Sequence, residues 1–570
     1  MAQPNQQFNI SGYNFQGLNT EMEPVGGDLS FALKADNAVI DKVGRVSARE
    51  TFTPTYMWNA TGMGPYPDAD ITAISAYFHG NRGSHSVVGT ALTGTYLPVS
   101  KPVTRKVWNG LETRDSHDFD PSQNTEYRQF YELNGNIIEA IAPTGDYSRA
   151  LYVHFKDRLF LFNKAMPFME FDVGAGTWNP VTHTPPPTIT AIDGDIAISA
   201  YGRLWVSGVD GDYQTIHYSS LLREDLWYDP SAEPADNTND GGIINVSEYW
   251  PVEYDEIVNI HAHNGFLIVF GRQSILLYAN ASNGDPAGEN GIFLQDAISS
   301  VGLIERDALC NIGTDVVFCD DTGIRSIGRV IQEKSNPVAE PSLNVKRDFM
   351  DMIKTERESA SLVAGIRMTY FPTKSMYVVL FRSQAMAYTF STNPPSTTGG
   401  AMATRWTDCH FASMYFAETF EKGIPYLGGR WNRGVLSYEG HRTQEPFEFR
   451  FESMALGISQ GQMMDIMSKS IIYLIASESI PVDAKALWGF EGRLQYEYDF
   501  RTNPIGSTEY NVAEWGVDEY IGPNNGIWRS KVNTMGSGPF LRVGLAATIQ
   551  NTGIAIQEIA VNTAVGRLVA

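Results

Sequence analysis

The chain has 570 residues, of which 43% are hydrophobic and 12% aromatic, so it is long enough for a large core and for two or more domains. Its 42 basic and 65 acidic side chains give a net charge of -23, which argues against sequence-independent binding of DNA by the whole surface. The 52 glycines and 29 prolines favour short strands and tight turns over long helices.

The chain starts with a polar segment rich in Gly and Asn, and we predict an N-terminal arm over residues 1–30. In residues 35–49, a turn at residues 42–44 is predicted to join two short strands. The first seven residues lack the basic and apolar stretches of a secretion signal, and no segment reaches the roughly 18 apolar residues of a membrane span. We therefore expect synthesis and assembly in the cytoplasm.

A pair of strands then recurs along the chain: a turn opens into a hydrophobic run, and a second run ends near Tyr or Phe. The first runs cover residues 155–162, 200–206, 263–270, 313–319 and 373–381, and their partners cover 168–172, 215–218, 274–278, 323–327 and 385–390. Weaker copies lie at 84–89 and 423–427. Successive units are roughly 45 to 73 residues apart, which is the spacing of propeller blades with inserted loops.

This repeat predicts an all-β fold with a β-propeller over residues 31–445, because a meander of strands cannot bury both of its faces alone. An all-β sandwich with similar strands is the alternative. Loops rich in Asn, Asp, Gly, Pro or Ser are predicted insertions where partners dock, at residues 97–135, 229–242, 280–291 and 391–400.

One helix stands out. Residues 343–353 follow a Pro-Ser start and place Leu343, Phe349, Met350 and Ile353 on one predicted face. Helix is otherwise expected to be scarce.

The repeat stops after about residue 445, and residues 446–570 are predicted to form a separate β-sandwich-like platform domain. Its expected strands include an alternating run at 447–453, a buried run at 469–476, and closing runs at 540–549 and 554–561. Residues 501–538 are rich in Asn, Gly and Pro and are predicted to form a long loop.

Acidic residues gather in one part of the predicted propeller, since residues 224–271 contain no Lys or Arg. The candidate channel or rim residues there are Glu224, Asp225, Asp229, Glu233, Asp236, Asp240, Glu253, Asp255 and Glu256. Such a segment is either a solvated face that keeps the protein soluble or a wall past which a polyanion slides.

Two aspartate patterns fail as ligand motifs. Residues 199–205 come nearest to the Asp box of sialidase-type propellers, but Tyr201 stands where Asp is required. The Asp-Gly-Asp runs at 193–195 and 210–212 lack the Gly and Glu that complete a calcium loop, so they are predicted to be turns.

Other catalytic and metal patterns are weak or missing. His261 and His263 share one face of a predicted strand but need a third ligand to bind zinc. The cysteines read as small apolar residues of the core, at positions 310, 319 and 409. No nucleophile elbow, phosphate loop or zinc-protease helix is found. We therefore predict no enzyme, cofactor or metal site.

Three segments point to a family. Residues 36–49, 256–278 and 315–327 resemble the tail nozzle proteins of short-tailed bacteriophages (podoviruses), also called tail tubular or packaged-DNA stabilisation proteins. The resemblance covers most of residues 30–440, and residues 538–544 extend it.

The resemblance implies a homohexameric ring in the virion tail that extends the portal and adaptor channel, retains packaged DNA and conducts it during ejection. Its implied partners are the ring itself, the tail adaptor protein, tail fibres or spikes, and viral DNA that passes without specific binding. It also implies a six-bladed propeller. Because about seven strand pairs are counted, one at an end is expected to belong to another domain.

A tube that conducts DNA should not bind it, because every phosphate contact would have to break during ejection. We therefore expect part of the acidic segment to face the channel. The alternative function is a glycan-binding or glycan-degrading propeller of a phage tail, in which Trp58, Trp108 and Trp250 stack on sugar rings. A cytosolic interaction propeller is a third reading, but its repeated Trp-Asp dipeptides are missing.

Overall fold

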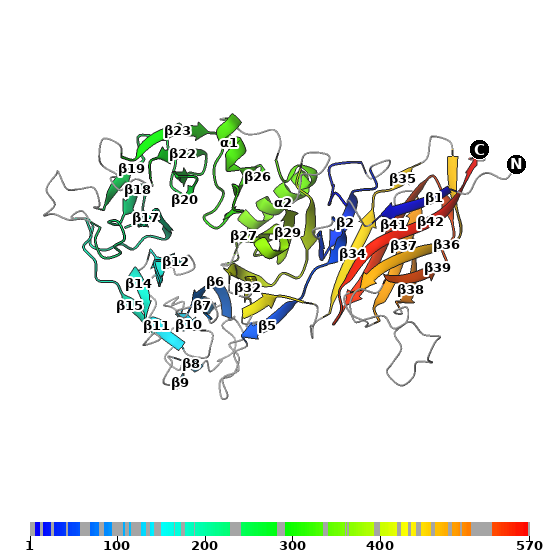
Figure 1. Cartoon of the computed structure of the whole chain (residues 1–570), viewed down its shortest axis with the longest axis horizontal. Coiled ribbons are helices and arrows are strands. Elements are labelled where there is room, and N and C mark those ends of the chain that lie inside the picture. The colour runs from blue at the N-terminus through cyan, green and yellow to red at the C-terminus, as the bar shows by residue number, and fades with distance from the viewer. Residues whose placement is uncertain are drawn as a thin grey trace, which may run out of the picture.

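The computed structural model shows an all-β chain with a ring of small sheets at one end and a β-sandwich at the other (Figure 1). The first described strand, β1 (Gln6–Ser11), and the last, β42 (Ile554–Arg567), pair side by side in the sandwich. The structure describes residues 6–11, 15–23, 28–40, 44–56, 69–78, 85–93, 106–108, 113–115, 127–132, 137–141, 150–164, 166–172, 177–186, 189–227, 241–281, 291–333, 340–359, 361, 364–392, 400–418, 423–430, 435–440, 446–457, 462–476, 481–490, 493–502 and 527–567.

The first three sheets of the ring, blades 1 to 3, each contain four antiparallel strands. Blade 1 consists of β6 (Ala69–Phe78), β7 (His85–Thr93), β10 (Tyr127–Glu132) and β11 (Ile137–Ile141), and the hairpin β8 (Lys106–Trp108) and β9 (Thr113–Asp115) is inserted in it. Blade 2 consists of β12 (Leu151–Phe155), β13 (Arg158–Asn163), β14 (Met166–Asp172) and β15 (Thr177–Pro180). Blade 3 consists of β16 (Ile196–Ala200), β17 (Arg203–Val209), β18 (Asp212–Tyr218) and β19 (Gly242–Asn245).

Blades 4 to 7 continue the ring. Blade 4 consists of β20 (Asn259–His263), β21 (Phe266–Phe270), β22 (Ser274–Ala279) and β23 (Phe293–Ser299), and blade 5 of β24 (Leu309–Asn311), β25 (Val316–Asp320) and β26 (Gly323–Ser326). Blade 6 consists of β27 (Ile366–Phe371), β28 (Met376–Phe381), β29 (Met386–Ser391) and β30 (Ala403–Trp406). Blade 7 consists of β31 (Phe411–Glu418), β32 (Gly423–Gly429), β33 (Val435–Tyr438) and β5 (Phe52–Tyr56).

Tight two-residue turns explain why the repeated sequence forms these hairpins. The turns at Tyr201-Gly202, Asp210-Gly211 and Asn264-Gly265 all have two consecutive positive φ angles. This geometry matches the right-handed twist of paired strands and favours Gly, Asn and Asp. The Asp-Gly run at 210–211 is therefore a hairpin turn, as predicted from the sequence.

The ring closes on itself. The first strand of each blade is the innermost, and β31 of blade 7 contacts β6 of blade 1. The N-terminal strand β5 completes blade 7 by pairing antiparallel with β33, from Phe52 opposite Tyr438 to Tyr56 opposite Val435. The β-propeller prediction is confirmed, but the described strands form seven blades rather than the six that the resemblance implied. Both terminal strand pairs, which include β7 and β32, belong to the ring.

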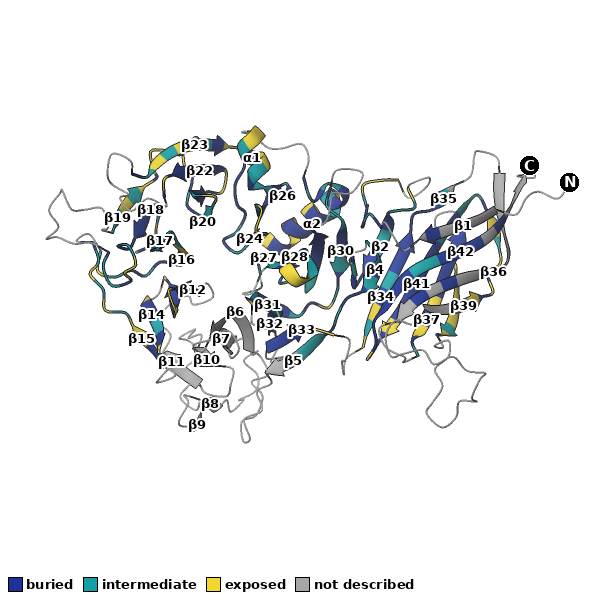
Figure 2. Ribbon diagram, viewed as in Figure 1, coloured by how far each residue is buried: buried dark blue, intermediate teal, exposed yellow. Residues whose placement is uncertain are grey.

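Buried residues, dark blue in Figure 2, lie along the described strands of the ring. Apolar side chains of neighbouring blades pack together in shared clusters. Blades 3 and 4, for example, enclose one cluster that includes Trp205, Ile216, Leu267 and Leu276, which are all at most 1% exposed. Burying such a side chain contributes roughly 1.5–3 kcal/mol. Similar clusters of described residues join the other neighbouring blades in order from blade 1 to blade 7.

The helices pack outside the ring at blades 5 and 6. They are α1 (Ile327–Glu333), the short 3-10 helix η4 (Leu343–Val345) and α2 (Lys346–Arg357), with a further 3-10 turn η5 (Pro372–Lys374). The predicted face was correct for Phe349 and Ile353 but wrong for Met350, which is exposed, because the buried stripe runs through Met352 instead. Among the described helices, none has the length and hydrophobicity to cross a bilayer.

The sandwich packs two sheets face to face. One contains β34 (Phe447–Ser453), β35 (Leu456–Gly457), β41 (Phe540–Ile549), β37 (Asp483–Phe490) and β38 (Tyr496–Arg501). The other contains β36 (Gln462–Ala476), β39 (Ile527–Val532), β40 (Ser537–Gly538) and β42 (Ile554–Arg567), joined by β1 (Gln6–Ser11), β3 (Ala38–Ile40) and β4 (Val46–Ala48). The predicted hairpin around residues 42–44 is confirmed by the β3–β4 pair.

The sandwich is not the separate domain that was predicted. Strand β2 (Ala32–Asp36) pairs in parallel with β30 of blade 6 and antiparallel with β34, so one ten-stranded sheet runs from the propeller into the sandwich. One apolar cluster also spans blades 4 to 6 and both sandwich sheets. Within the predicted N-terminal arm, β1 pairs with β42, and Phe15 and Leu18 are buried in the apolar cluster that joins the two halves.

Two predicted loops contain strands. The predicted insertion at 97–135 includes β10, which pairs with β7, and the predicted loop at 501–538 includes β39, which pairs with β36. Both strands carry many polar residues, which is why composition alone suggested loops. The other three predicted insertions coincide mainly with residues 228–240, 282–290 and 393–399, which lie outside the described residues.

A buried Asn–Arg pair fastens the junction of the two halves. Asn37 has a left-handed φ of 51°, and its amide donates to Thr407 Oγ1 and to the Glu448 carbonyl, both at 2.9 Å. Its side-chain oxygen accepts hydrogen bonds from Arg49 Nε at 2.9 Å and from the Thr407 amide at 3.0 Å. The Arg49 guanidinium lies 4.2 Å from the Phe52 ring centroid and 3.9 Å from that of Phe447.

We predict that Arg49→Met lowers the free energy of unfolding by about 2–4 kcal/mol, because it removes a charged hydrogen bond and two cation–π contacts and leaves the Asn37 side-chain oxygen with one hydrogen bond instead of two. Urea unfolding, followed by tryptophan fluorescence, measures the loss. The control is Lys354→Met, whose side chain is 73% exposed. It should change stability by less than about 0.5 kcal/mol, and equal effects of the two variants would contradict the role of Arg49.

Candidate functional site

The predicted acidic segment begins with a carboxylate that is buried between blades 2 and 3. Glu224 is 9% exposed, and its oxygens lie 2.9 Å from Lys156 Nζ and 2.7 Å from Arg158 Nη1. Those cations flank the β12–β13 turn, so two positive charges of blade 2 neutralise an acid of blade 3. Glu224 therefore ties neighbouring blades together and does not belong to an exposed acidic wall in this chain.

Asp225 is in a different position although it is the next residue. Its side chain is 46% exposed and pairs with Arg223 at 2.7 Å. The hydrogen bond from that guanidinium lowers the pKa of the Asp225 carboxyl. Asp225 is thus a surface acid with a local counter-charge.

Asp255 organises the loop between β21 and β22 from inside blade 4. It is 4% exposed, and its oxygens accept amide hydrogen bonds from Glu256 at 2.9 Å, Arg272 at 2.8 Å and Gln273 at 3.0 Å. A Cβ at Gly271 would come within 2.4 Å of its Oδ2 atom, so the approach requires glycine. Because Asp255 is buried, it cannot be part of an exposed acidic surface, which differs from its prediction as a channel or rim residue.

The other predicted acids are exposed or lie outside the described residues. Glu253 is exposed, and half-buried Glu256 accepts a hydrogen bond of 2.6 Å from Tyr254, which is 69% exposed. Asp229, Glu233, Asp236 and Asp240 lie outside the described residues. Whether any of these acids faces a channel stays a prediction.

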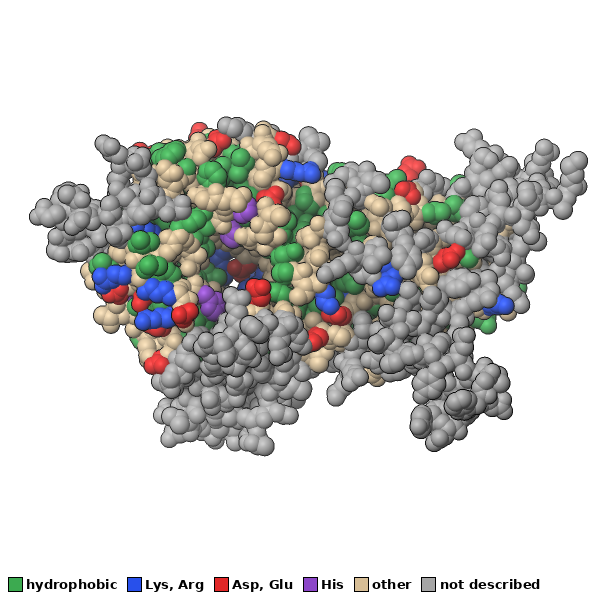
Figure 3. Space-filling view, viewed as in Figure 1, with side chains coloured by type: hydrophobic (Ala, Val, Ile, Leu, Met, Phe, Trp, Pro, Cys, Tyr) green, Lys and Arg blue, Asp and Glu red, His purple; other side chains and the backbone are tan. Residues whose placement is uncertain are grey.

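A histidine pair lies on β20, the inner strand of blade 4. Figure 3 shows histidine side chains beside the hollow at the centre of the ring. His261 and His263 of β20 share one face of the strand, as predicted. Burial, with a smaller contribution from the charge of His263, lowers the pKa of His261 to about 4, and its Nε2 atom has no hydrogen-bond partner. Within the described part of the chain, no cluster of three metal-ligating side chains occurs.

The structure agrees with the prediction for the cysteines and disagrees with that for Trp250. Cys310, Cys319 and Cys409 are buried and unbridged, which confirms their role in the core. Trp250 is only 8% exposed and donates to Gln214 at 2.8 Å, so it is not the exposed sugar platform that was suggested. Trp58 and the side chain of Trp108 lie outside the described residues.

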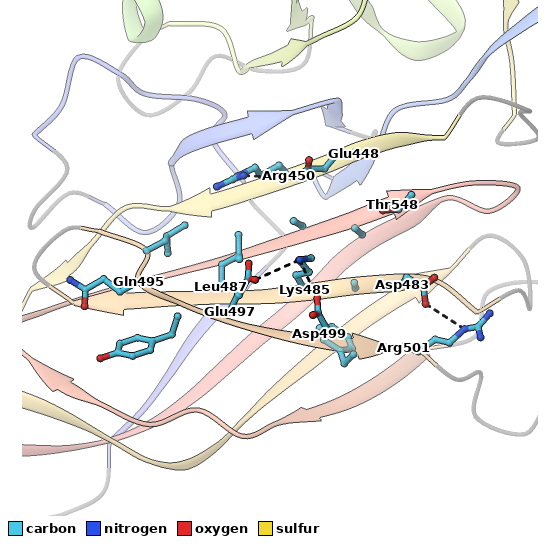
Figure 4. Close-up of a pocket in the computed structure, with 16 residues that line it drawn as sticks. Glu448, Arg450, Asp483, Lys485, Leu487, Gln495, Glu497, Asp499, Arg501 and Thr548 are labelled. Carbon is cyan, nitrogen blue, oxygen red and sulfur yellow. Dashed lines mark ion pairs between the residues drawn. The ribbon is translucent and has the colours of Figure 1, made fainter.

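A groove of about 930 Å³ crosses the outer face of the sandwich, and the sequence analysis did not identify it (Figure 4). Strands β34, β41, β37 and β38 contribute its lining, which is dominated by charges. Lys485 lies between Glu497 at 3.7 Å and Asp499 at 3.3 Å, and Arg501 lies 3.5 Å from Asp483. These pairs are exposed, so water and salt weaken them and their charges remain available to a docking protein.

The groove ends at β38, which is the last strand of its sheet. On the other face of this strand, Tyr496 is 45% and Tyr498 is 39% exposed. Tyr496 stacks on Trp488 with 5.7 Å between the ring centroids. The alternation in Tyr-Glu-Tyr-Asp-Phe-Arg was the sequence signal for a two-faced strand here, but nothing local indicated that its edge would be free.

Comparisons with known proteins show no relative by sequence. No protein-family model matches the chain, and no curated protein matches it. Among solved structures, Hsv2 of Kluyveromyces lactis is similar with 10% identity and a TM-score of 0.30, over 60% of this chain and 99% of that one. Hsv2 of Kluyveromyces marxianus has 11% identity and a TM-score of 0.27, over 51% and 80% of the two chains. At these values the similarity carries no argument about function.

We predict that Glu224→Gln lowers the free energy of unfolding by about 1–3 kcal/mol, because two cations of blade 2 lose their shared partner. Asp225→Asn is the matched control. It removes the same charge one residue further along, at an exposed pair, and should cost less than about 0.5 kcal/mol. Chemical unfolding at neutral pH compares them, and a larger effect of the Asp225 variant would refute the assignment.

We also predict that His261 makes the fold sensitive to acid. Its folded pKa of about 4 is below the ordinary value of 6.5, so the unfolded chain binds the proton first, and stability is lost as the pH falls from about 6.5 towards 4. Between pH 7 and pH 5 the loss from this residue should be about 1 kcal/mol, after allowance for its partial exposure. The His261→Asn variant should lose that much less stability than the parent over this range. Parallel pH profiles would disprove the assignment.

Proposed function

We propose that this chain is a structural subunit of the tail nozzle of a short-tailed bacteriophage, as its sequence resemblance suggests. In this role six copies form a ring that extends the portal and adaptor channel, retains packaged DNA and conducts it during ejection. Tail fibres or spikes dock on the outside of the ring. The chain works in the virion tail after assembly in the host cytoplasm, without a cofactor.

The observation that best supports the proposal is the continuity between propeller and sandwich. A conduit that holds pressurised DNA needs subunits whose parts do not move against each other. Here one sheet and one apolar cluster run through both halves. Two of the three segments that carry the resemblance form hairpins of blades 4 and 5, and the third forms the junction with the sandwich.

The charge balance supports the same role. The net charge of -23 opposes adhesion of DNA, and neutralising phosphate contacts are what make a protein bind DNA tightly. The exposed acids of the segment, such as Glu248 and Glu253, are available to repel a passing polyanion. The paired acids Glu224 and Asp225 contribute less to that repulsion.

Electron microscopy of the purified full chain, alone and with the tail adaptor, tests the proposal. We expect rings with six-fold symmetry and no tight binding of duplex DNA at physiological salt. Stable monomers that do not assemble with the adaptor would overturn the ring. Turnover of host polysaccharide by the purified protein would instead favour the glycan-active alternative.

Two double charge-reversal variants test separately whether exposed acids such as Glu248 and Glu253 repel DNA in the ring. In assembled rings, Glu248→Lys with Glu253→Lys should raise the retention of duplex DNA, since two repelling charges become attracting ones. Asp351→Lys with Glu358→Lys makes the same change in net charge at two exposed positions, one in α2 and one directly after it, and should have little effect. Equal retention by both double variants would show that position in the ring does not matter and would sink the wall hypothesis.

A further inference from the structure

Strand β38 forms one edge of its sheet in the sandwich. In the part of the chain that the structure describes, β38 is hydrogen-bonded to β37 and to no other strand, although the edge strand β39 of the other sheet lies near it. An edge strand presents unpaired amide and carbonyl groups, which are a template for another strand. This edge also borders the charged groove (Figure 4), and its strand carries the exposed Tyr496 and Tyr498.

The two faces of β38 differ in chemistry. Glu497, Asp499 and Arg501 lie on the groove face, since they pair in register with Leu487, Lys485 and Asp483 of β37. Tyr498 and Phe500 alternate with them and lie on the opposite face. A strand added to this edge must therefore match charges on one face and aromatic rings on the other.

The side chains of β38 are complementary to those of a second copy of β38 that runs antiparallel to it. In the register that places Glu497 opposite Arg501 of the second copy, two-fold symmetry forms this charge pair twice. The same register places Tyr498 opposite Phe500, also twice, and like faces stay together. Asp499 meets its own copy at the centre, where each carboxylate already has Lys485 at 3.3 Å.

We propose that β38 is a self-association site, at which two copies of this chain pair antiparallel through residues 496–501. The resulting sheet is continuous across both molecules. A ring with a single six-fold axis contains no two-fold contact, so this pairing joins free chains or two rings. The inference is therefore independent of the proposed nozzle function, and rings without β38 pairing would leave that function intact.

Charge reversal tests this site in the full chain. We expect a monomer–dimer equilibrium in sedimentation, weakened about tenfold or more by Glu497→Arg or by Arg501→Glu, because each variant replaces two attractions by two repulsions. Mixing the two single variants should restore dimers, since arginines at 497 and 501 of one chain then face glutamates at 501 and 497 of the other. Each chain in this mixture carries only one substitution.

Glu448→Arg is the matched control. It reverses an exposed charge on the same sheet face, in β34, and should leave the equilibrium unchanged. Thermal unfolding of each variant separates loss of pairing from loss of folding. A parent protein that stays monomeric at high concentration would overturn the proposal, and so would dimers that resist both single variants or a mixture that does not recover.

Discussion

The relative orientation of the propeller and the sandwich depends on the hydrogen bonds of the Asn37 side chain. One side chain satisfies groups from the N-terminal segment, the end of blade 6 and the first strand of the sandwich sheet. Asn tolerates the left-handed backbone that this position requires, whereas most residues do so at a cost of roughly 1–2 kcal/mol. Arg49 completes the junction by filling the space between Phe52 and Phe447. Orientation of the two halves is thus set by directional bonds as well as by apolar packing.

The same short segment performs two tasks, and this couples them. Strand β2 extends the sheet of blade 6 into the sandwich, and β5, which begins 16 residues after β2 ends at Asp36, closes blade 7. Opening the ring at β5 would pull directly on Arg49 and Asn37. Local opening of one half is therefore resisted by the other, so the chain should unfold in larger cooperative units than a propeller and a sandwich joined by a loop.

The blades could be predicted because their turns and strands are close together in sequence. Pairings between distant segments could not be predicted. Turns such as Asn264-Gly265 and the hydrophobic runs beside them involve only a few neighbouring residues, which is why the strand pairs were found, although six blades were expected and seven are present. The pairing of β5 with β33 joins residues almost 400 positions apart and leaves no periodic signal. The same limit applies to the site: composition located Glu224 and Asp255, but their burial depends on Arg158 and on the amides near Arg272, which are distant in sequence. The groove was missed because its charges are ordinary for a solvated strand.

These buried acids also change how the negative charge should be understood. A carboxylate held between two cations, as Glu224 is, produces almost no field outside the protein, although it counts fully in the net charge. Salt screens exposed charges beyond about 8 Å at physiological ionic strength. A polyanion passing the surface therefore responds more strongly to nearby exposed acids such as Glu253 than to the total of -23. Acids buried inside the protein stabilise the blades, whereas exposed acids act on a molecule that passes the surface. A conduit for DNA is therefore expected to have exposed acids distributed evenly along its wall.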